Sequence, residues 1–422
     1  MPNTWYNRIL YHILLVTVSL LATEAVVRVV RPQPQLVRSY IGIDPDLGPI
    51  SKPHISYYDT KGREKWGYKY HVHTNNLGLR MNRDVKGDSP AREVLFLGNS
   101  IVFGWGNELE DSFYGRLQQQ LKCQNILLMN GGYGTYSTGH CRKLVQRLAK
   151  KNVVADLVYF LSLGDMHNNI RRDPDYRVYD YRIGPARTVE FRPVQVFPAW
   201  KRWLYLHTPY NWLNQNSHAF TFMKEFVKEA GNSAGEALAR AGNMSSVAED
   251  TEPKPENSER EKSGKAPPPD KRGTEPRPAD QEIRVEYSGS WSRKELEEAW
   301  LVTRGHLRAM REFCAEHNKQ FLIVWLPASD EFKTGRGKPE AEMLKERLSD
   351  EFGDAFIDPA AECVAKSNDY TPDALFFGDG HWTPLANRIY ANAIRSRIVD
   401  RLGGVHCVRF RSSAFQSGAG GR

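Results

Sequence analysis

Two segments of the sequence carry residue types that can perform acyl chemistry. Ser100 follows Gly98 and Asn99 at the end of an apolar run, where its hydroxyl can act as a nucleophile. Asp379 stands two residues before His381, so its carboxylate can hold one imidazole tautomer while the other ring nitrogen takes the serine proton. Taken singly, each segment is equally typical of a capping serine or a structural Asp–His turn.

A third segment adds backbone donors. Gly131 and Gly132 follow Asn130 at the end of another apolar run. Consecutive glycines allow the backbone to approach a ligand and to point N–H groups into a cleft. Any sharp turn also favours glycine, so this signal depends on its neighbours.

Apolar runs ending in polar or glycine residues predict the elements that position these segments. We expect buried strands at 94–97, 125–130, 157–163 (closed by Gly164) and 321–326. Helices are expected from Asp111, a good cap, and over 138–150, 300–317 and 383–402. Strands that alternate with helices predict an α/β fold with a parallel sheet, whose carboxyl edge is where such folds place their sites.

The amino terminus predicts a membrane anchor. Residues 9–27 are almost entirely apolar and approach the ~20 residues that cross a bilayer. No convincing cleavage site follows, so we favour an anchor, residues 1–31, over a signal peptide. Arg28, Arg31 and Arg38 follow this stretch and only Arg8 precedes it, a charge pattern that does not favour export of the rest of the chain.

Composition divides the remainder. We expect a partly stranded lead-in at 32–92, a first domain part with an aromatic-rich insertion at 93–227, and a second part at 291–402. Residues 248–282 contain no large apolar residue and many prolines, which predicts a disordered linker at 228–290. Residues 403–422 form a loose tail. The Trp and Tyr residues at 200–212 either line a sugar or acyl groove or form the core of the insertion.

Charge, cysteine spacing and histidine spacing argue against a nucleic-acid partner and against a metal site. The 58 Lys and Arg against 50 Asp and Glu give a net charge of +8, but without a dense basic block, so we expect no nucleic-acid partner. The five cysteines form no C-x-x-C pair and are expected to be free and buried. His71, His73 and His167 lack metal-ligand spacing. We therefore expect neither a metal nor a cofactor.

Taken in order, these segments resemble the SGNH/GDSL hydrolase superfamily, in particular its membrane-anchored bacterial branch. The resemblance runs from about Val72 to Leu402, omitting the predicted linker. It is carried by EAVVR at 24–28, TNNLGLR at 74–80, EVLFLGNSIVFGWG at 93–106, DSFYGRL at 111–117, NGGYGTYST at 130–138 and DGHWTPLAN at 379–387.

The resemblance implies a flavodoxin-like three-layer domain in which Ser100 is the nucleophile, His381 the base and Asp379 the residue that orients it. The family's oxyanion hole uses the backbone N–H groups of the serine and of a glycine, here Gly132, with an asparagine amide. Asp165 occupies that last position in this chain. Members of the family act on acyl esters, including O-acetyl groups on glycans, and some transfer acyl groups.

Two positions depart from the family pattern in opposite senses. Asn99 replaces the usual aspartate, and Asp165 replaces the usual asparagine. An ionised Asp165 would repel an oxyanion, and loss of one donor typically lowers the rate ~10²–10³-fold. A protonated Asp165, the nearby Asn168 and the amide of Asn99 are three open ways to restore the donor.

We therefore expect a serine esterase that removes acyl groups, in particular acetyl, from a cell-envelope glycan or related ester. The resemblance places its domain on the periplasmic or extracellular side of the cell membrane. The Asp-x-His spacing is similar to that of alginate O-acetylation proteins, so the first alternative is O-acyl transfer to an exported polysaccharide, supplied by a membrane acyltransferase partner. The second alternative is an impaired domain that binds acylated ligands.

Overall fold

The structure, a computed structural model, describes residues 4–32, 40–44, 46–60, 66–86, 91–122, 125–171, 177–196, 198–227, 230–231 and 291–403. The predicted linker (228–290) and tail (403–422) therefore lie outside the described residues, apart from 230–231 and 403. The chain divides into two units. The sheet unit is Val37–Asn211 with Trp291–Arg422, and the helical unit is Met1–Leu36 with Trp212–Ser290.

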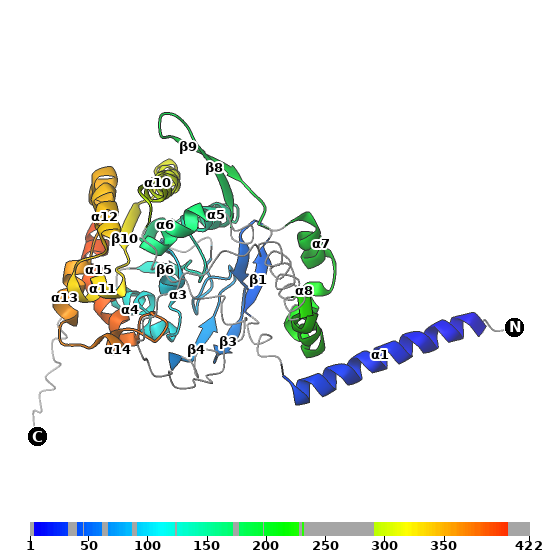
Figure 1. The fold of residues 1–422 in the computed structure, drawn as a ribbon. Helices are drawn as coiled ribbons and strands as arrows, with labels where there is room; N and C mark the ends of the chain where they lie inside the picture. Colours follow the sequence, from blue (N-terminus) through cyan, green and yellow to red (C-terminus); the bar gives the residue numbers. More distant parts are fainter. Residues whose placement is uncertain are drawn as a thin grey trace, which may run out of the picture. The chain divides into compact units, whose positions relative to one another are not determined.

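A five-stranded parallel sheet forms the centre of the sheet unit (Figure 1). Its strands are β5 (Arg92–Leu97), β6 (Ile126–Asn130), β7 (Asp156–Leu161), β10 (Phe321–Trp325) and β11 (Phe356–Ile357), in the order β11-β10-β7-β5-β6. Numbered within the sheet, this order is 2-1-3-4-5, the flavodoxin-like arrangement. The predicted α/β fold class is therefore confirmed. The order reverses between β5 and β7, so the switch point lies at the carboxyl end of β5.

Helices cover both faces of the sheet because its strands are apolar on both sides. One layer contains α5 (Thr138–Ala149), α6 (Leu163–Ile170), α10 (Arg293–Glu316) and α12 (Pro339–Phe352). The other contains α4 (Phe113–Gln120), α13 (Ala360–Ser367) and α15 (Pro384–Arg401), with α11 (Ser329–Thr334) against α13 and α14 (Pro372–Leu375) against α15. The sheet unit therefore has three layers, with the sheet between two layers of helices.

Capping explains where the observed elements differ from the predicted ones. The third strand ends at Leu161, because Ser162 caps α6 and Gly164 lies within that helix. Asp111 ends a short 3-10 helix, Leu109–Asp111, and Ser112 is the cap of α4. The predicted helix at 300–317 begins at Arg293, where Ser292 and Glu295 form a capping box. A second 3-10 helix spans Gly353–Ala355.

The lead-in forms two small antiparallel ribbons. β1 (Ile41–Asp44) pairs with β2 (Gly48–Ser51), and β3 (Ser56–Asp59) pairs with β4 (Tyr70–His73). Three of its tyrosines, Tyr40, Tyr68 and Tyr70, form a second core with Val72 and with Phe103. Phe103 belongs to α3 (Ser100–Phe103), so the lead-in packs directly on the helix that begins with the candidate nucleophile.

The aromatic-rich insertion of the sheet unit divides into a packed and an exposed part. The β8–β9 ribbon (Tyr179–Ile183 with Val189–Pro193) packs on α10, where the Phe191 ring stacks 3.9 Å from that of His306. In α7 (Ala199–His207), Trp200 and Trp203 are 68% and 59% exposed. These tryptophans therefore do not form an insertion core, contrary to that interpretation of the sequence.

In the helical unit, α1 (Thr4–Val30) is an unbroken helix of 27 residues. Its stretch Trp5–Val30 is long and apolar enough to cross a membrane, a property that anchors and signal sequences share. The unit also contains most of α8 (Tyr210–Asn216) and a helix at 218–227. Among the cysteines of the described residues, Cys141, Cys314 and Cys363 are free and buried, as expected.

Candidate active site

Ser100 is the first residue of α3, directly beyond the carboxyl end of β5. Gly98 makes the turn, since its φ is +155° and a Cβ there would lie 2.5 Å from Val102 Cγ2. Asn99 caps α3 by accepting the Ile101 N–H through Oδ1 at 3.0 Å. The sequence thus places a serine hydroxyl on a sharp strand-to-helix turn at the sheet's switch point.

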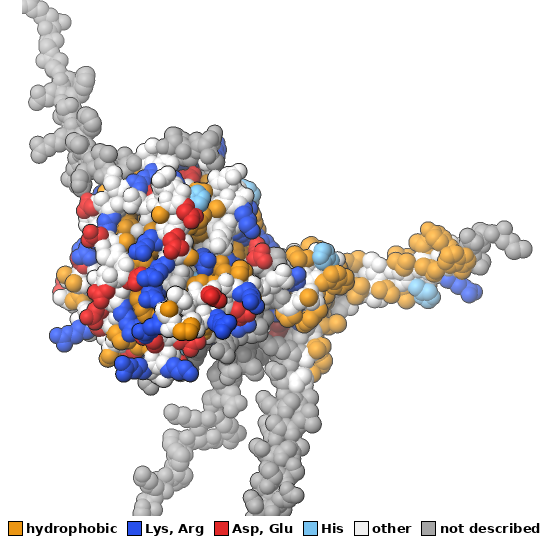
Figure 2. All heavy atoms as spheres, turned by 90° about the horizontal axis from the view of Figure 1, so that it is seen from above, with side chains coloured by type: hydrophobic (Ala, Val, Ile, Leu, Met, Phe, Trp, Pro, Cys, Tyr) orange, Lys and Arg blue, Asp and Glu red, His pale blue; other side chains and the backbone are white. Residues whose placement is uncertain are grey.

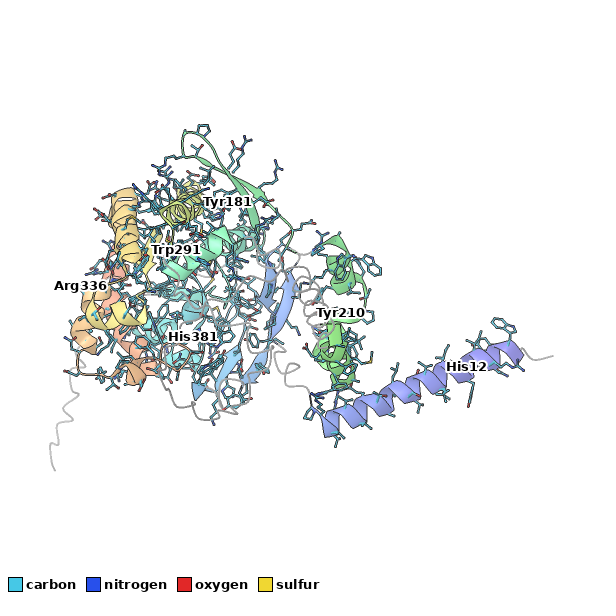
Figure 3. The ribbon with its side chains drawn as sticks, in the orientation of Figure 1. His12, Tyr181, Tyr210, Trp291, Arg336 and His381 are labelled. Carbon is cyan, nitrogen blue, oxygen red and sulfur yellow. The ribbon has the colours of Figure 1, made fainter. Side chains whose placement is uncertain are left out.

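His381 lies in the loop between α14 and α15. The loop is fixed by its own backbone, with Phe377 N donating to His381 O at 2.7 Å. Thr383 caps α15, as the sequence predicts. Asn107 Nδ2 donates to Trp382 O at 2.8 Å and so ties this loop to the segment that follows α3. In Figure 3 the labelled His381 lies beside α3 and α4.

The structure brings the three predicted catalytic residues together. His381 Nε2 lies 2.9 Å from Ser100 Oγ, across 281 residues of sequence. His381 Nδ1 lies 2.9 Å from Asp379 Oδ2, although its N–H is not aligned on that oxygen. Asp379 Oδ1 also accepts the His381 backbone N–H at 3.1 Å. The side chains of His381 and Asp379 are only 16% and 11% exposed.

Two further aromatic residues extend this arrangement. Tyr68 donates its hydroxyl to Asp379 Oδ2 at 2.8 Å, and Trp105 Nε1 donates to the Tyr68 oxygen at 2.9 Å. The Trp105 ring also stacks on the His381 ring, with centroids 6.1 Å apart. The sequence reasoning missed both residues. For Tyr68 the only signal was an aromatic run at 66–70, which strand alternation explains equally well, and Trp105 lies within the motif at 93–106 without any sign of a contact with His381.

Burial and neighbouring groups shift the pKa values of Asp379 and Tyr68 in opposite directions. Burial raises the pKa of Asp379, but hydrogen bonding from His381 and Tyr68 outweighs this effect and holds that pKa below its ordinary value. Burial, with the charge of Asp379, raises the pKa of Tyr68 far above its ordinary value. Tyr68 is therefore a permanent donor to the carboxylate that faces His381.

Arg80 binds the carboxyl-terminal end of α3, the helix that begins with Ser100. Its buried guanidinium donates to the carbonyl oxygens of Phe103, Gly104, His71 and Asn107, at distances between 2.6 and 2.8 Å. It also lies over the Phe103 ring, 4.9 Å from the centroid. Arg80 belongs to the motif at 74–80, to which the sequence reasoning assigned no structural role.

Gly132 lies where the β6 turn crosses α3. A Cβ at this position would lie 2.4 Å from Phe103 N and 2.6 Å from Val102 C, so only glycine fits. The Gly132 N–H donates to Asn130 Oδ1 at 3.0 Å. Gly132 is therefore close to α3, the helix that Ser100 begins, but its N–H is already bound to Asn130 Oδ1.

Asp165 is buried at the start of α6, and its carboxylate is surrounded by donors. Oδ2 accepts the Ser162 N–H at 2.8 Å and the Ser162 hydroxyl at 2.9 Å. Asn99 Nδ2 lies 3.1 Å from Oδ1 and 3.3 Å from Oδ2. Burial raises the pKa of Asp165 to about 7, against the lowering effect of these hydrogen bonds.

The two departures from the family pattern thus face one another. The Asn99 amide donates to Asp165 and, at 3.1 Å, to Ser162 Oγ. An aspartate at 99 facing an asparagine at 165 would form the same kind of carboxylate–amide pair with the partners reversed. The amide of Asn169 donates to Thr138 and Thr303.

Comparisons with known proteins give resemblances of fold at low sequence identity. No protein-family profile and no curated protein matches the chain. A member of the lipolytic protein G-D-S-L family from Veillonella parvula DSM 2008 shares 9% identity at a TM-score of 0.34, over 72% of this chain and 97% of that one.

Two other solved structures resemble the chain similarly. An alpha/beta hydrolase enzyme from the metagenome of Lake Arreo, Spain, shares 10% identity at a TM-score of 0.31, over 75% of this chain and 97% of that one. A gut microbial diltiazem-metabolizing enzyme shares 13% identity at a TM-score of 0.33, over 74% of this chain and 48% of that one. All three TM-scores lie below 0.5, so the function proposed below rests on the chain's own residues.

Proposed function

We propose that the protein is a serine ester hydrolase that removes acyl groups, in particular acetyl, from a cell-envelope glycan or related ester. The observation that carries this proposal is the 2.9 Å contact between Ser100 Oγ and His381 Nε2, with Asp379 beyond Nδ1. A nucleophile, a base and an orienting carboxylate in this geometry define the chemistry of acyl transfer.

In the acylation step, Ser100 Oγ attacks the ester carbonyl carbon while His381 Nε2 takes the hydroxyl proton. The tetrahedral intermediate collapses, the ester C–O bond breaks, and His381 returns that proton to the departing alcohol. Asp379 stabilises the imidazolium that forms in between. Tyr68 holds this carboxylate in place by donating to Oδ2, and Trp105 holds Tyr68, so that the carboxylate stays beside His381.

The oxyanion requires backbone donors at the start of α3. The Ser100 N–H is one of the first-turn donors that a helix leaves without an intrahelical partner. Gly132 can join it when the substrate oxygen replaces Asn130 Oδ1 as the acceptor. We propose that Asp165 contributes indirectly, because its carboxylate binds Asn99 and Ser162 and thereby fixes the cap that precedes the nucleophile.

Deacylation decides between the leading function and its first alternative. Water activated by His381 releases the acid and regenerates Ser100, which is hydrolysis. A sugar hydroxyl in place of water gives O-acyl transfer, for which a membrane acyltransferase would be the expected acyl source. The residues around Ser100 are the same in both reactions, so the acceptor must be found by experiment.

The test is turnover of a chromogenic acetyl ester by the full chain in detergent. The proposal predicts release of the chromophore by wild type and by Ser349→Ala, a control at an exposed serine on α12. Ser100→Ala should be inactive. Release that depends on an added oligosaccharide would establish the transferase. A folded wild type without turnover, but with affinity for acylated sugars, would support the binding domain and refute the enzyme.

We further propose that α1 anchors the protein in the cell membrane, with the sheet unit on the periplasmic or extracellular side. Support comes from the length and apolar character of Trp5–Val30. Retention of the mature chain in alkaline-washed membranes and cleavage of the sheet unit by protease added outside would agree with this topology. Release of a shortened chain would indicate a signal sequence instead.

A further inference from the structure

A run of apolar side chains outside the candidate active site faces solvent. We call residues 199–227, which comprise α7, α8 and the helix at 218–227, the apolar segment. Seven of its large hydrophobic side chains are between 53% and 68% exposed: Trp200, Trp203, Leu206, Trp212, Met223, Phe226 and Val227. Hydrophobic residues in such density on a surface indicate an interaction site.

In the sheet unit, α7 has its hydrophobic side outward. Trp200, Trp203 and Leu206 recur every three residues and so share one side of the helix. They are more exposed than Lys201 and Arg202 of the same helix. A helix of a water-soluble surface has the opposite pattern, with its charged residues outermost.

In the helical unit, the helix at 218–227 is joined to the carboxyl-terminal end of α1. Glu24 of α1 accepts hydrogen bonds from Ser217 Oγ at 2.8 Å and from the backbone N–H groups of His218 and Ala219, each at 3.0 Å. Arg31 lies over the Phe222 ring, 5.2 Å from its centroid. The start of this helix is therefore held at the end of the candidate membrane span.

The same helix carries exposed apolar residues at the spacing of one face. Met223, Phe226 and Val227 stand at positions i, i+3 and i+4 and are all more than 60% exposed. This exposed apolar face therefore belongs to a helix whose start is bound to α1, which is itself apolar and exposed along its length. Figure 2 shows the hydrophobic side chains of α1 along nearly all of that helix.

We propose that the apolar segment lies in the interfacial layer of the lipid bilayer that α1 enters, with its exposed tryptophans at the level of the lipid headgroups. Tryptophan is enriched at that level because its ring is apolar and its N–H is polar. Helices that lie in this layer bury an apolar face ~5–10 Å deep. This inference rests on the proposed membrane anchor but not on the proposed esterase activity.

Chain connectivity permits this placement for α7 as well. The ten residues between the end of α1 at Val30 and the start of β1 at Ile41 span at most about 35 Å. At the other end, His207 of α7 precedes Ser217, the residue bound to Glu24, by only ten positions.

The test uses the full chain in vesicles of phosphatidylcholine and phosphatidylglycerol. An environment-sensitive fluorophore is attached at Trp203→Cys, Leu206→Cys or Phe226→Cys, after Cys123 and Cys407 have been replaced by serine. The other three cysteines are buried. The matched control is Ser349→Cys, an exposed polar position on α12. Emission is compared in lipids with ordinary and with brominated acyl chains.

We expect the brominated lipids to quench the three labels in the apolar segment by about half or more, at the shallow depth of an interfacial helix, and to leave the control unchanged. Labels that behave like the control, on protein that floats with the vesicles, would overturn the inference while leaving the anchor intact. Protein that does not float would remove the anchor and the inference together. The same labels are also measured in native membranes, where shielding that is absent from the vesicles would identify a protein partner in place of lipid and refute the inference.

Discussion

The pairing of Asn99 with Asp165 makes a quantitative prediction. Asn99→Asp retains an oxygen for the Ile101 N–H, so the cap of α3 survives. Its second oxygen then takes the place of the Asn99 amide nitrogen, which lies 3.1 and 3.3 Å from the two carboxylate oxygens of Asp165. Two carboxylates at this distance share one proton at neutral pH, as like charges so close cannot both ionise.

The cost follows from the pKa of Asp165, which burial raises from 3.8 to about 7. A native pKa above the unfolded one means that the native state holds the extra proton between these values, so stability falls as pH rises from about 4 to about 7. In the folded Asn99→Asp variant, the carboxyl groups at 99 and 165 must keep their shared proton above pH 7 as well. Each further pH unit costs about 1.4 kcal/mol, so the variant should lose about 1.4 kcal/mol at pH 8 and almost nothing at pH 6.

The assay is urea unfolding at pH 6 and pH 8 of the wild type, the two single variants and the double variant. The double variant Asn99→Asp with Asp165→Asn restores a carboxylate–amide pair. It should return to within ~0.5 kcal/mol of the wild type at pH 8. A loss of stability that is equal at both pH values, or a double variant as unstable as Asn99→Asp, would refute the reasoning.

Three further substitutions test the supports of the site. Tyr68→Phe removes one hydrogen bond to a charged group, about 1.5 kcal/mol, so kcat/KM should fall about tenfold. An unchanged kcat/KM for the acetyl ester would contradict this role. Gly132→Ala places a methyl group 2.4 Å from Phe103 N and should lower stability by about 2 kcal/mol or more in thermal unfolding. Arg80→Lys leaves some of the four carbonyl oxygens that Arg80 binds without a donor, and each loss costs ~1–3 kcal/mol. The variant should therefore have a lower melting temperature and a lower esterase rate. Wild-type values for both would show that the Arg80 hydrogen bonds are not needed.

The central strands could be predicted because they depend on local patterns, whereas the pairing of Ser100 with His381 was implied only by the resemblance of their motifs to a known family. Apolar runs define the strands, and the carboxyl ends of parallel strands must meet at one sheet edge. Element boundaries were less accurate where a cap competes with an apolar run. Ser162 is an example, since it caps α6 and the third strand ends at Leu161, two residues before its predicted end at 163.

The supporting contacts could not be predicted because they join distant loops. The Tyr68–Asp379 hydrogen bond spans 311 residues, and nothing near Tyr68 in sequence indicates a carboxylate partner. The acceptor of the Gly132 N–H and the partner of Asp165 depend likewise on side-chain directions that spacing does not determine. The exposure of Trp200 and Trp203 is a further case, because tryptophan-rich segments are usually buried.

The most direct measurement of the central claim is labelling of the full chain in detergent with a fluorophosphonate, followed by mass spectrometry of the modified peptide. The wild type and the Ser349→Ala control should carry the adduct on Ser100. Ser100→Ala and His381→Ala should carry none, because the first lacks the nucleophile and the second lacks the base that activates it. A folded wild type that remains unlabelled, or an adduct that persists in Ser100→Ala, would contradict the assignment of Ser100 as an activated nucleophile.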